Sequence, residues 1–173
     1  FFVGTPQFVI PENSPGLFVV GHVAVDDVDI NDGKNLTFSQ CASGDSSGSE
    51  SNWDLFSLLE NGTLVVNSNV SVSNPWRSQL DFERGETYTL CLNVTDSGNG
   101  HGLPLSAQSI ASISLADQNE PPRFVQSSFT VGVNDGSPAG TLVGSPLQVA
   151  DQDAGSVHSF VVVSGNVTKF DVT

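Results

Sequence analysis

The fold class follows from one stretch, TYTLCLNVT at residues 87–95. Successive side chains of an extended strand point to opposite faces. The apolar residues of this stretch share one face: Tyr88, Leu90, Leu92 and Val94. The residues between them, from Thr89 to Thr95, are mostly polar. The stretch therefore predicts a strand with one side packed on a core and the other side facing solvent.

Other short segments carry a similar strand signal. They are rich in β-branched or aromatic residues, are separated by turns of Asn, Asp and Gly, and cover residues 8–10, 18–25, 36–40, 55–58, 63–66 and 109–115. In the last of them Ile110 falls out of phase with Ile113 and Leu115, which predicts a β-bulge. Together these segments predict an all-β fold, an antiparallel, seven-stranded Greek-key sandwich of the immunoglobulin-like kind.

The charge of the chain restricts its partners. Asp and Glu number 19 against 5 Lys and Arg, which gives a formal net charge of -14. Nucleic acid and anionic bilayers would be repelled by such a surface. No stretch reaches the roughly 18 consecutive apolar residues of a membrane span. Hard cations are the partners that this composition favours.

Cysteines and glycosylation sequons point to secretion. Cys91 lies on the outward face of its predicted strand, and Cys41 follows the inward positions of an earlier strand, so both point outward. A cross-strand disulfide between them and a pair of buried free thiols both remain open. Asn-X-Ser/Thr sequons occur at Asn35, Asn61, Asn69, Asn93 and Asn166. The sequons favour an extracellular location.

Acidic clusters recur along the chain. Asp27-Val28-Asp29 returns as Asp151-Gln152-Asp153, and Glu12 has its counterpart in Asp135. The same shift places Phe1 opposite Phe124. We therefore expect a complete repeat over residues 1–120, beginning at a domain boundary, and the N-terminal half of a second repeat over 121–173. Carboxylates at matched places predict a repeated site.

The acidic residues also predict the chemistry of that site. Asp81 and Glu83 are two positions apart, so on an extended strand both carboxylates would face the same way, and Asp151 and Asp153 repeat this spacing. Calcium takes six to eight oxygen ligands from carboxylates, amides and carbonyls. The predicted ligands are Glu12, Asp81, Glu83, Gln118 through its carbonyl, Asn119, Glu120, Asp151 and Asp153. The alternative is that each carboxylate is a solvated turn residue.

Several of these motifs together resemble a known family. They are Glu12-Asn13-Ser14-Pro15-Gly16, Asp27-Val28-Asp29, Leu80-Asp81-Phe82-Glu83, Asp96-Ser97-Gly98 and Asp117-Gln118-Asn119-Glu120-Pro121-Pro122. In this order the chain resembles the extracellular repeats of cadherins over its whole length. The resemblance implies calcium at the junction between consecutive repeats, with Asp27, Asp29 and Asp96 serving a second junction with an upstream repeat. Glu120 stands where the family usually has Asp.

The resemblance also implies a function. Calcium ions at the junction would rigidify a tandem array that serves calcium-dependent cell adhesion or recognition, in the ectodomain of a membrane protein. The implied partners are other cadherin-like repeats, in cis or in trans. The alternatives are a structural spacer and a carbohydrate-binding module that uses Trp76. We expect no enzyme, because His22, His101 and His158 are isolated and no catalytic motif occurs.

Overall fold

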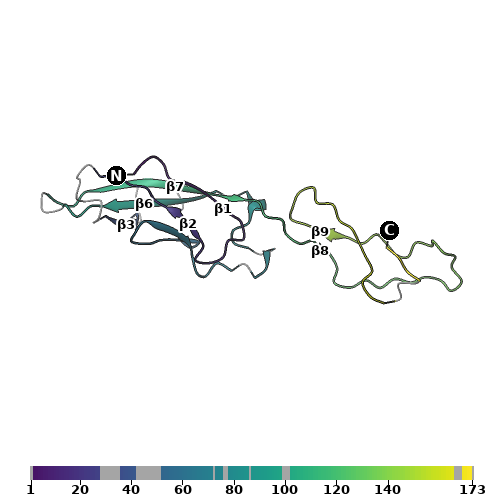
Figure 1. Ribbon diagram of the computed structural model, residues 1–173. Helices are drawn as coiled ribbons and strands as arrows, with labels where there is room; N and C mark the ends of the chain where they lie inside the picture. The colour runs from purple at the N-terminus through teal and green to yellow at the C-terminus, as the bar shows by residue number, and fades with distance from the viewer. Residues whose placement is uncertain are drawn as a thin grey trace. The chain divides into compact units, whose positions relative to one another are not determined.

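A computed structural model describes residues 2–27, 36–41, 52–71, 73–75, 78–85, 87–98, 102–165 and 169–172. The chain divides into two compact units, Phe1–Gln118 (unit 1) and Asn119–Thr173 (unit 2). The strands of unit 1 are β1 (Gln7–Pro11), β2 (Val19–His22), β3 (Thr37–Gln40), β4 (Phe56–Leu58), β5 (Thr63–Val66), β6 (Tyr88–Thr95) and β7 (Ser106–Ala116) (Figure 1). A 3-10 turn, η3 (Phe82–Arg84), precedes β6.

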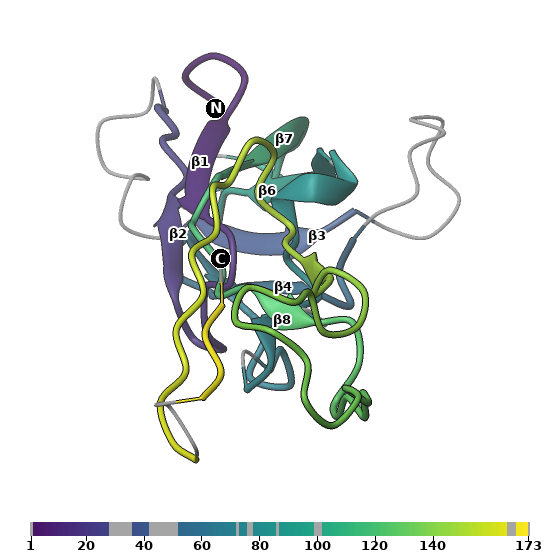
Figure 2. The same ribbon diagram turned by 90° about the vertical axis from the view of Figure 1, so that its right-hand side faces the viewer.

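The strands of unit 1 form two sheets. One has the order β1-β7-β6-β3 and the other the order β2-β5-β4. β1 pairs with β7 in parallel, and the other pairs within these sheets are antiparallel. The edge strands β1 and β2 lie side by side, which Figure 2 also shows. Each segment predicted as a strand overlaps one of these strands, and the β-sandwich fold class is confirmed.

The core of unit 1 lies between its sheets and is built around β6. Buried and half-buried residues alternate without interruption along this strand, so the predicted division of its faces is confirmed. Tyr88 packs edge-on against Phe56 of β4, with ring centroids 5.5 Å apart. Burying side chains of this size is the main stabilising term available to the unit.

The predicted bulge in β7 is wrong. Pairing between β6 and β7 runs unbroken from Tyr88 opposite Ile113 to Thr95 opposite Ser106. On the core-facing side of β7, the small residue Ala111 is buried and is in phase with Ile113 and Leu115. Ile110 instead lies opposite Cys91 on the other face of the sheet. The error arose from reading Ile110 as an inward residue and overlooking Ala111.

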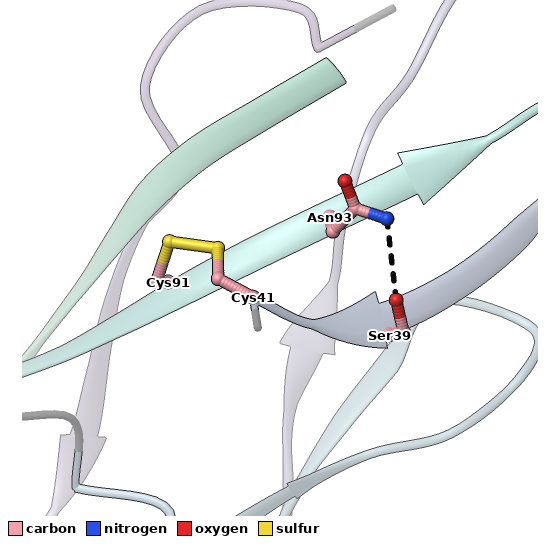
Figure 3. The surroundings of a disulfide bond; sticks show 4 residues. All are labelled: Ser39, Cys41, Cys91 and Asn93. Atoms are coloured by element: carbon pink, nitrogen blue, oxygen red, sulfur yellow. Dashed lines mark hydrogen bonds between the residues drawn. A yellow bond between two sulfur atoms is a disulfide. The ribbon is translucent and has the colours of Figure 1, made fainter. Parts of the chain in front are cut away.

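The two cysteines form a disulfide across neighbouring strands. Cys41 follows β3 and is bonded to Cys91 of β6, with Cα atoms 5.4 Å apart (Figure 3). The backbone N–H of Cys41 also donates to the carbonyl of Cys91 at 3.1 Å. The disulfide alternative is therefore confirmed, and the alternative of buried free thiols is wrong.

Unit 2 has little regular structure in its described residues. β8 (Arg123–Phe124) pairs with β9 (Val149–Ala150). The ring of Phe124 contacts those of Phe129 and Phe160, at centroid distances of 5.9 Å and 6.2 Å. None of the described apolar side chains of this unit is fully buried. The repeat boundary expected after residue 120 stays a prediction.

Among the described residues, no helix has the length and hydropathy that a membrane span requires.

Candidate metal centre

Glu12 forms hydrogen bonds that hold three segments together at one end of the sandwich. It follows β1, and its side chain is buried. Its Oε2 accepts a hydrogen bond from the backbone N–H of Phe82 at 2.9 Å, and its Oε1 accepts one from Gln118 at 2.8 Å. The N–H of Glu12 itself donates to the carbonyl of Ala116 at 2.9 Å. The carboxylate thus holds the end of β1, the start of η3 and the chain beyond β7 together.

Asp81 and Glu83 do not lie on an extended strand, so the predicted local geometry is wrong. Asp81 is the extended residue before η3, and Glu83 is in the middle of this 3-10 turn. The turn ends at Gly85, whose φ of 67° lies in the left-handed region that glycine adopts without strain. The N–H of Gly85 donates to the carbonyl of Phe82 at 2.8 Å. A tight turn, and not strand alternation, sets the directions of the two carboxylates.

The turn nevertheless brings the two carboxylates to Glu12. One carboxylate oxygen from each of Glu12, Asp81 and Glu83 lies within 4.8 Å of the others. Asp81 is buried, and no described residue donates a hydrogen bond to its Oδ1. A buried oxygen without a donor is costly unless something else satisfies it. A set of hard oxygen ligands with one such atom fits a hard divalent cation, so this cluster could hold calcium.

The negative charges of the cluster affect the pKa of Glu83. Its pKa is raised, first by partial desolvation and then by the negative charges of Glu12, Asp81 and Asp117. A hydrogen bond from the backbone lowers the pKa and offsets part of this rise. Like charges at close range disfavour ionisation. A cation at this place would favour the ionised form of Glu83.

Arg84 is a residue of this cluster that the sequence interpretation missed. Its Nε lies 3.2 Å from Oδ2 of Asp81, and its side chain is 56% exposed against 7% for that of Asp81. The available signal was a basic residue three positions after Asp81, which a 3-10 turn places next to it. An assumed strand would have sent the two side chains to opposite faces.

Unit 2 holds its own predicted ligands in a tight turn after β9. The N–H of Asp153 donates to Oδ1 of Asp151 at 3.1 Å, and the N–H of Glu120 donates to Oδ2 of Asp153 at 2.9 Å. The side-chain amide of Asn119 donates to the carbonyl of Glu120 at 3.3 Å. Asp151 and Asp153 therefore do not share the extended spacing that was predicted, and their positions as ligands remain predictions.

His158 contradicts the interpretation that each histidine is isolated. Its Nε2 lies 2.7 Å from Oδ2 of Asp151. This hydrogen bond is the largest cause that lowers the pKa of Asp151, and the N–H of Asp153 lowers it further against the opposing effect of desolvation. His101 lies outside the described residues. The distance of seven positions between Asp151 and His158 gave no sequence signal for this contact.

The residues predicted for an upstream site lie elsewhere in unit 1. Asp96 directly follows β6, at the far end of the strand from η3, and its Oδ1 accepts hydrogen bonds from Gly98 at 2.8 Å and Leu105 at 3.0 Å. Asp27 follows the bridge between Phe2 and Val25. Asp29 lies outside the described residues. The two predicted sets are thus well separated within this unit.

Comparison with known proteins adds sequence relatives. No family model matches the chain. It is 31% identical over 176 residues to cadherin EGF LAG seven-pass G-type receptor 2 of Mus musculus, covering 99% of this chain and 5% of that protein. It is 28% identical over 172 residues to cadherin-23 of Homo sapiens, covering 96% of this chain and 5% of that protein. The chain thus spans a small part of the length of these relatives.

Solved structures share the fold. The ectodomain of human desmocollin-1 matches with a TM-score of 0.54 and 24% identity, covering 91% of this chain and 27% of that one. Human protocadherin-24 EC1-2 matches with a TM-score of 0.61 and 22% identity, covering 89% of this chain and 61% of that one. Together with the sequence relatives and the motif order, these matches identify the chain. It belongs to the cadherin family and is an extracellular segment built from cadherin repeats.

Proposed function

We propose that this chain is a calcium-rigidified segment of a cell-adhesion or recognition ectodomain. The observation that carries the proposal is the cluster of Glu12, Asp81 and Glu83, in which Oδ1 of Asp81 is buried and receives no hydrogen bond from the described part of the chain. The family of the chain supports the adhesive context. A net charge of -14 gives the protein a general attraction for cations.

The proposed ligands come from three parts of the chain. Glu12, Asp81 and Glu83 lie in unit 1, Gln118 to Glu120 lie where unit 1 ends and unit 2 begins, and Asp151 and Asp153 lie farther along unit 2. Bound calcium would supply positive charge that offsets the repulsion among these groups and would link the parts of the chain that carry them. Glu12 contributes before any cation binds, since its hydrogen bond to Gln118 fixes where the connection leaves unit 1.

Partners follow from the same family. We propose that the chain associates with other cadherin-like repeats, in cis or in trans, and that it belongs to the ectodomain of a membrane protein. One solved relative, protocadherin gammaB7 EC3-6, is described as a cis-dimer; it is 25% identical with a TM-score of 0.52 and covers 90% of this chain and 31% of that one. Trp76, which the carbohydrate-binding alternative requires, lies outside the described residues.

Thermal unfolding tests the calcium proposal. The midpoint should rise when millimolar calcium is added, because a ligand that binds only the folded state stabilises it. Magnesium at the same concentration should raise it less, since magnesium demands a stricter octahedral geometry. A flat response, or equal stabilisation by magnesium, would overturn the proposal. A screen for self-association in calcium separates an adhesive segment from a spacer.

A further inference from the structure

Arg84 is a positive charge placed on a proposed calcium ligand. Its Nε contacts Oδ2 of Asp81 at 3.2 Å, while Oδ1 of the same carboxylate is buried and has no hydrogen-bond donor among the residues that the structure describes. The chain has only 5 Lys and Arg in total. Arg84 therefore offsets part of the local negative charge in a strongly acidic molecule.

We propose that Arg84 is a built-in counter-cation that opposes calcium at Asp81 and so raises the calcium concentration at which the cluster fills. The inference rests on the proposed function and adds a control on affinity to it. No titration is involved, because a guanidinium stays charged at every relevant pH.

Two effects of removing Arg84 can be weighed. Losing an ion pair whose cation is 56% exposed has a small effect, since solvent screens such pairs. Removing a positive charge within a few ångströms of a doubly charged ion relieves a larger repulsion, because the Coulomb energy scales with the product of the charges. Relief of repulsion should therefore exceed the loss of the contact, and the affinity for calcium should rise.

Without calcium, Arg84 has the opposite effect: it stabilises the cluster. Arg84 then offsets part of the repulsion among Glu12, Asp81 and Glu83, so its loss should destabilise the calcium-free protein. A residue with a merely structural role would lower stability without tightening calcium binding. The combination of a less stable calcium-free state and tighter binding is the signature of a competing counter-cation.

The test compares Arg84→Gln with Lys169→Gln in the 173-residue chain. Lys169 is exposed, and no described residue forms an ion pair with it, so its substitution changes the net charge equally. Calorimetric titration with calcium should show a dissociation constant about 3- to 10-fold lower for Arg84→Gln, a smaller change for Lys169→Gln, and a near wild-type value for Arg84→Lys. In EDTA, the unfolding midpoint of Arg84→Gln should fall by about 1–4 °C.

The outcomes separate this inference from the proposed function. If the wild type binds calcium and Arg84→Gln binds it equally or more weakly, the counter-cation role is wrong while the calcium site stands. An equal gain in affinity for Lys169→Gln would also overturn the role, because net charge alone would explain it. If the wild type does not bind calcium, both proposals fail.

A separate observation concerns the sequon Asn61-Gly62-Thr63. Asn61 is exposed in the hairpin between β4 and β5, where its Oδ1 accepts a hydrogen bond from the N–H of Thr63 at 3.0 Å. Gly62 turns the chain with a φ of 81°. Among the described residues, no acceptor contacts the Nδ2 of Asn61. The nitrogen that N-glycosylation modifies is therefore accessible.

The sequon at Asn93 has a different environment. Asn93 is half-buried on β6, beside the Cys41–Cys91 disulfide (Figure 3). Its Nδ2 donates to Oγ of Ser39 at 3.3 Å and to Oγ1 of Thr95 at 3.2 Å. Replacing one N–H by a sugar would break one of these bonds and would place a bulky glycan against the sheet.

We infer that Asn61 carries an N-linked oligosaccharide and that Asn93 does not. In the reaction, the C1 atom of a lipid-diphosphate-activated oligosaccharide forms a bond to Nδ2. The C1–O bond to the diphosphate breaks, its electron pair leaves with the lipid diphosphate, and one Nδ2 proton is lost to a base. The amide stays neutral, so the fold loses no charge.

Secretion of the 173-residue chain from mammalian cells tests the second inference. Enzymatic release of N-glycans in heavy-oxygen water converts each modified Asn to labelled Asp, which peptide mass spectrometry detects. We expect label at Asn61, none at Asn93, and loss of one glycan in Asn61→Gln but not in Asn93→Gln. An unlabelled Asn61, or a labelled Asn93, would overturn it.

Discussion

Unit 1 and unit 2 differ in how they treat apolar side chains. Unit 1 encloses a core between its sheets, with Leu90, Leu92 and Ile113 fully buried. In unit 2 comparable residues stay outside, among them Leu142 at 88% and Val163 at 88% exposure. Because burial of apolar surface drives folding, unit 1 holds the means of its own stability and the described part of unit 2 does not.

The proposed ligands follow the same division. Glu12 is held by two backbone N–H donors within the folded frame of unit 1. Asp151 is held by the N–H of Asp153 and by His158, and Asp153 by the N–H of Glu120, in a unit whose described residues enclose no core. A preformed half-site binds without first paying the entropy of ordering. We therefore expect the carboxylates of unit 1 to set the position of bound calcium, and those of unit 2 to become ordered as it binds.

Separating the units should give the largest effect. Residues 1–118 expressed alone should unfold in one cooperative transition, because their core and disulfide are complete. Residues 119–173 alone should show no cooperative transition and narrow amide dispersion in NMR spectra, since a segment this short buries too little apolar surface. A cooperative transition in the second fragment would remove the contrast between the units.

Matched leucine truncations sharpen the same contrast. Leu92→Ala creates a cavity in the core of unit 1 and should lower the free energy of unfolding by about 2–5 kcal/mol. Leu142→Ala removes an exposed side chain and should change it by less than about 0.5 kcal/mol. Urea denaturation of both variants, followed by circular dichroism, measures the difference. Equal losses would mean that Leu142 packs in a core that the structure does not show.

Acidification in EDTA should act on the two units with opposite signs. The pKa of Glu83 is raised in the folded state, so its contribution to stability is present below the ordinary glutamate value and is lost as pH rises through the folded pKa. The pKa of Asp151 is lowered, so its contribution is present above the ordinary aspartate value and is lost as pH falls through the folded pKa. The effect of Glu83 is small, because its side chain is exposed and solvent screens its charge.

Carboxyl carbon shifts in NMR titrations measure these two pKa values directly. Glu83 should titrate above the usual range for glutamate, and Asp151 below the usual range for aspartate. His158→Gln should move the pKa of Asp151 upward and leave that of Glu83 unchanged, because the histidine contact is the largest cause of the lowering. Identical midpoints for Asp151 in the wild type and the variant would show that the contact with His158 does not form in solution.

Sequence patterns predicted the strands better than the site. The alternation along β6 could be predicted from the sequence alone, because one face of the strand is buried and carries the apolar residues while the other face is not. The environment of Asp81 depends on η3, a three-residue turn that no periodicity reveals. The contacts of Arg84 and His158 depend on that turn and on the path after β9, so both were missed.

The disulfide was predictable only as one alternative. The alternation of side chains along a strand predicts which way Cys41 and Cys91 point. The distance between them depends on β3 and β6 being neighbours in register. Pairing between strands far apart in sequence is a tertiary property. The error at Ile110 has a similar origin. The buried position of β7 is taken by the small Ala111, which pairs with Leu90 of β6, and the packing that favours a small residue there is a tertiary property.

The central claim is that bound calcium links unit 1 and unit 2. Amide ¹⁵N relaxation on the 173-residue chain, with calcium and with EDTA, tests it most directly. In calcium the amides of residues 1–118 and the ordered amides of 119–173 should report one shared, longer rotational correlation time, and in EDTA two different ones. Separate correlation times that calcium leaves unchanged would contradict the account.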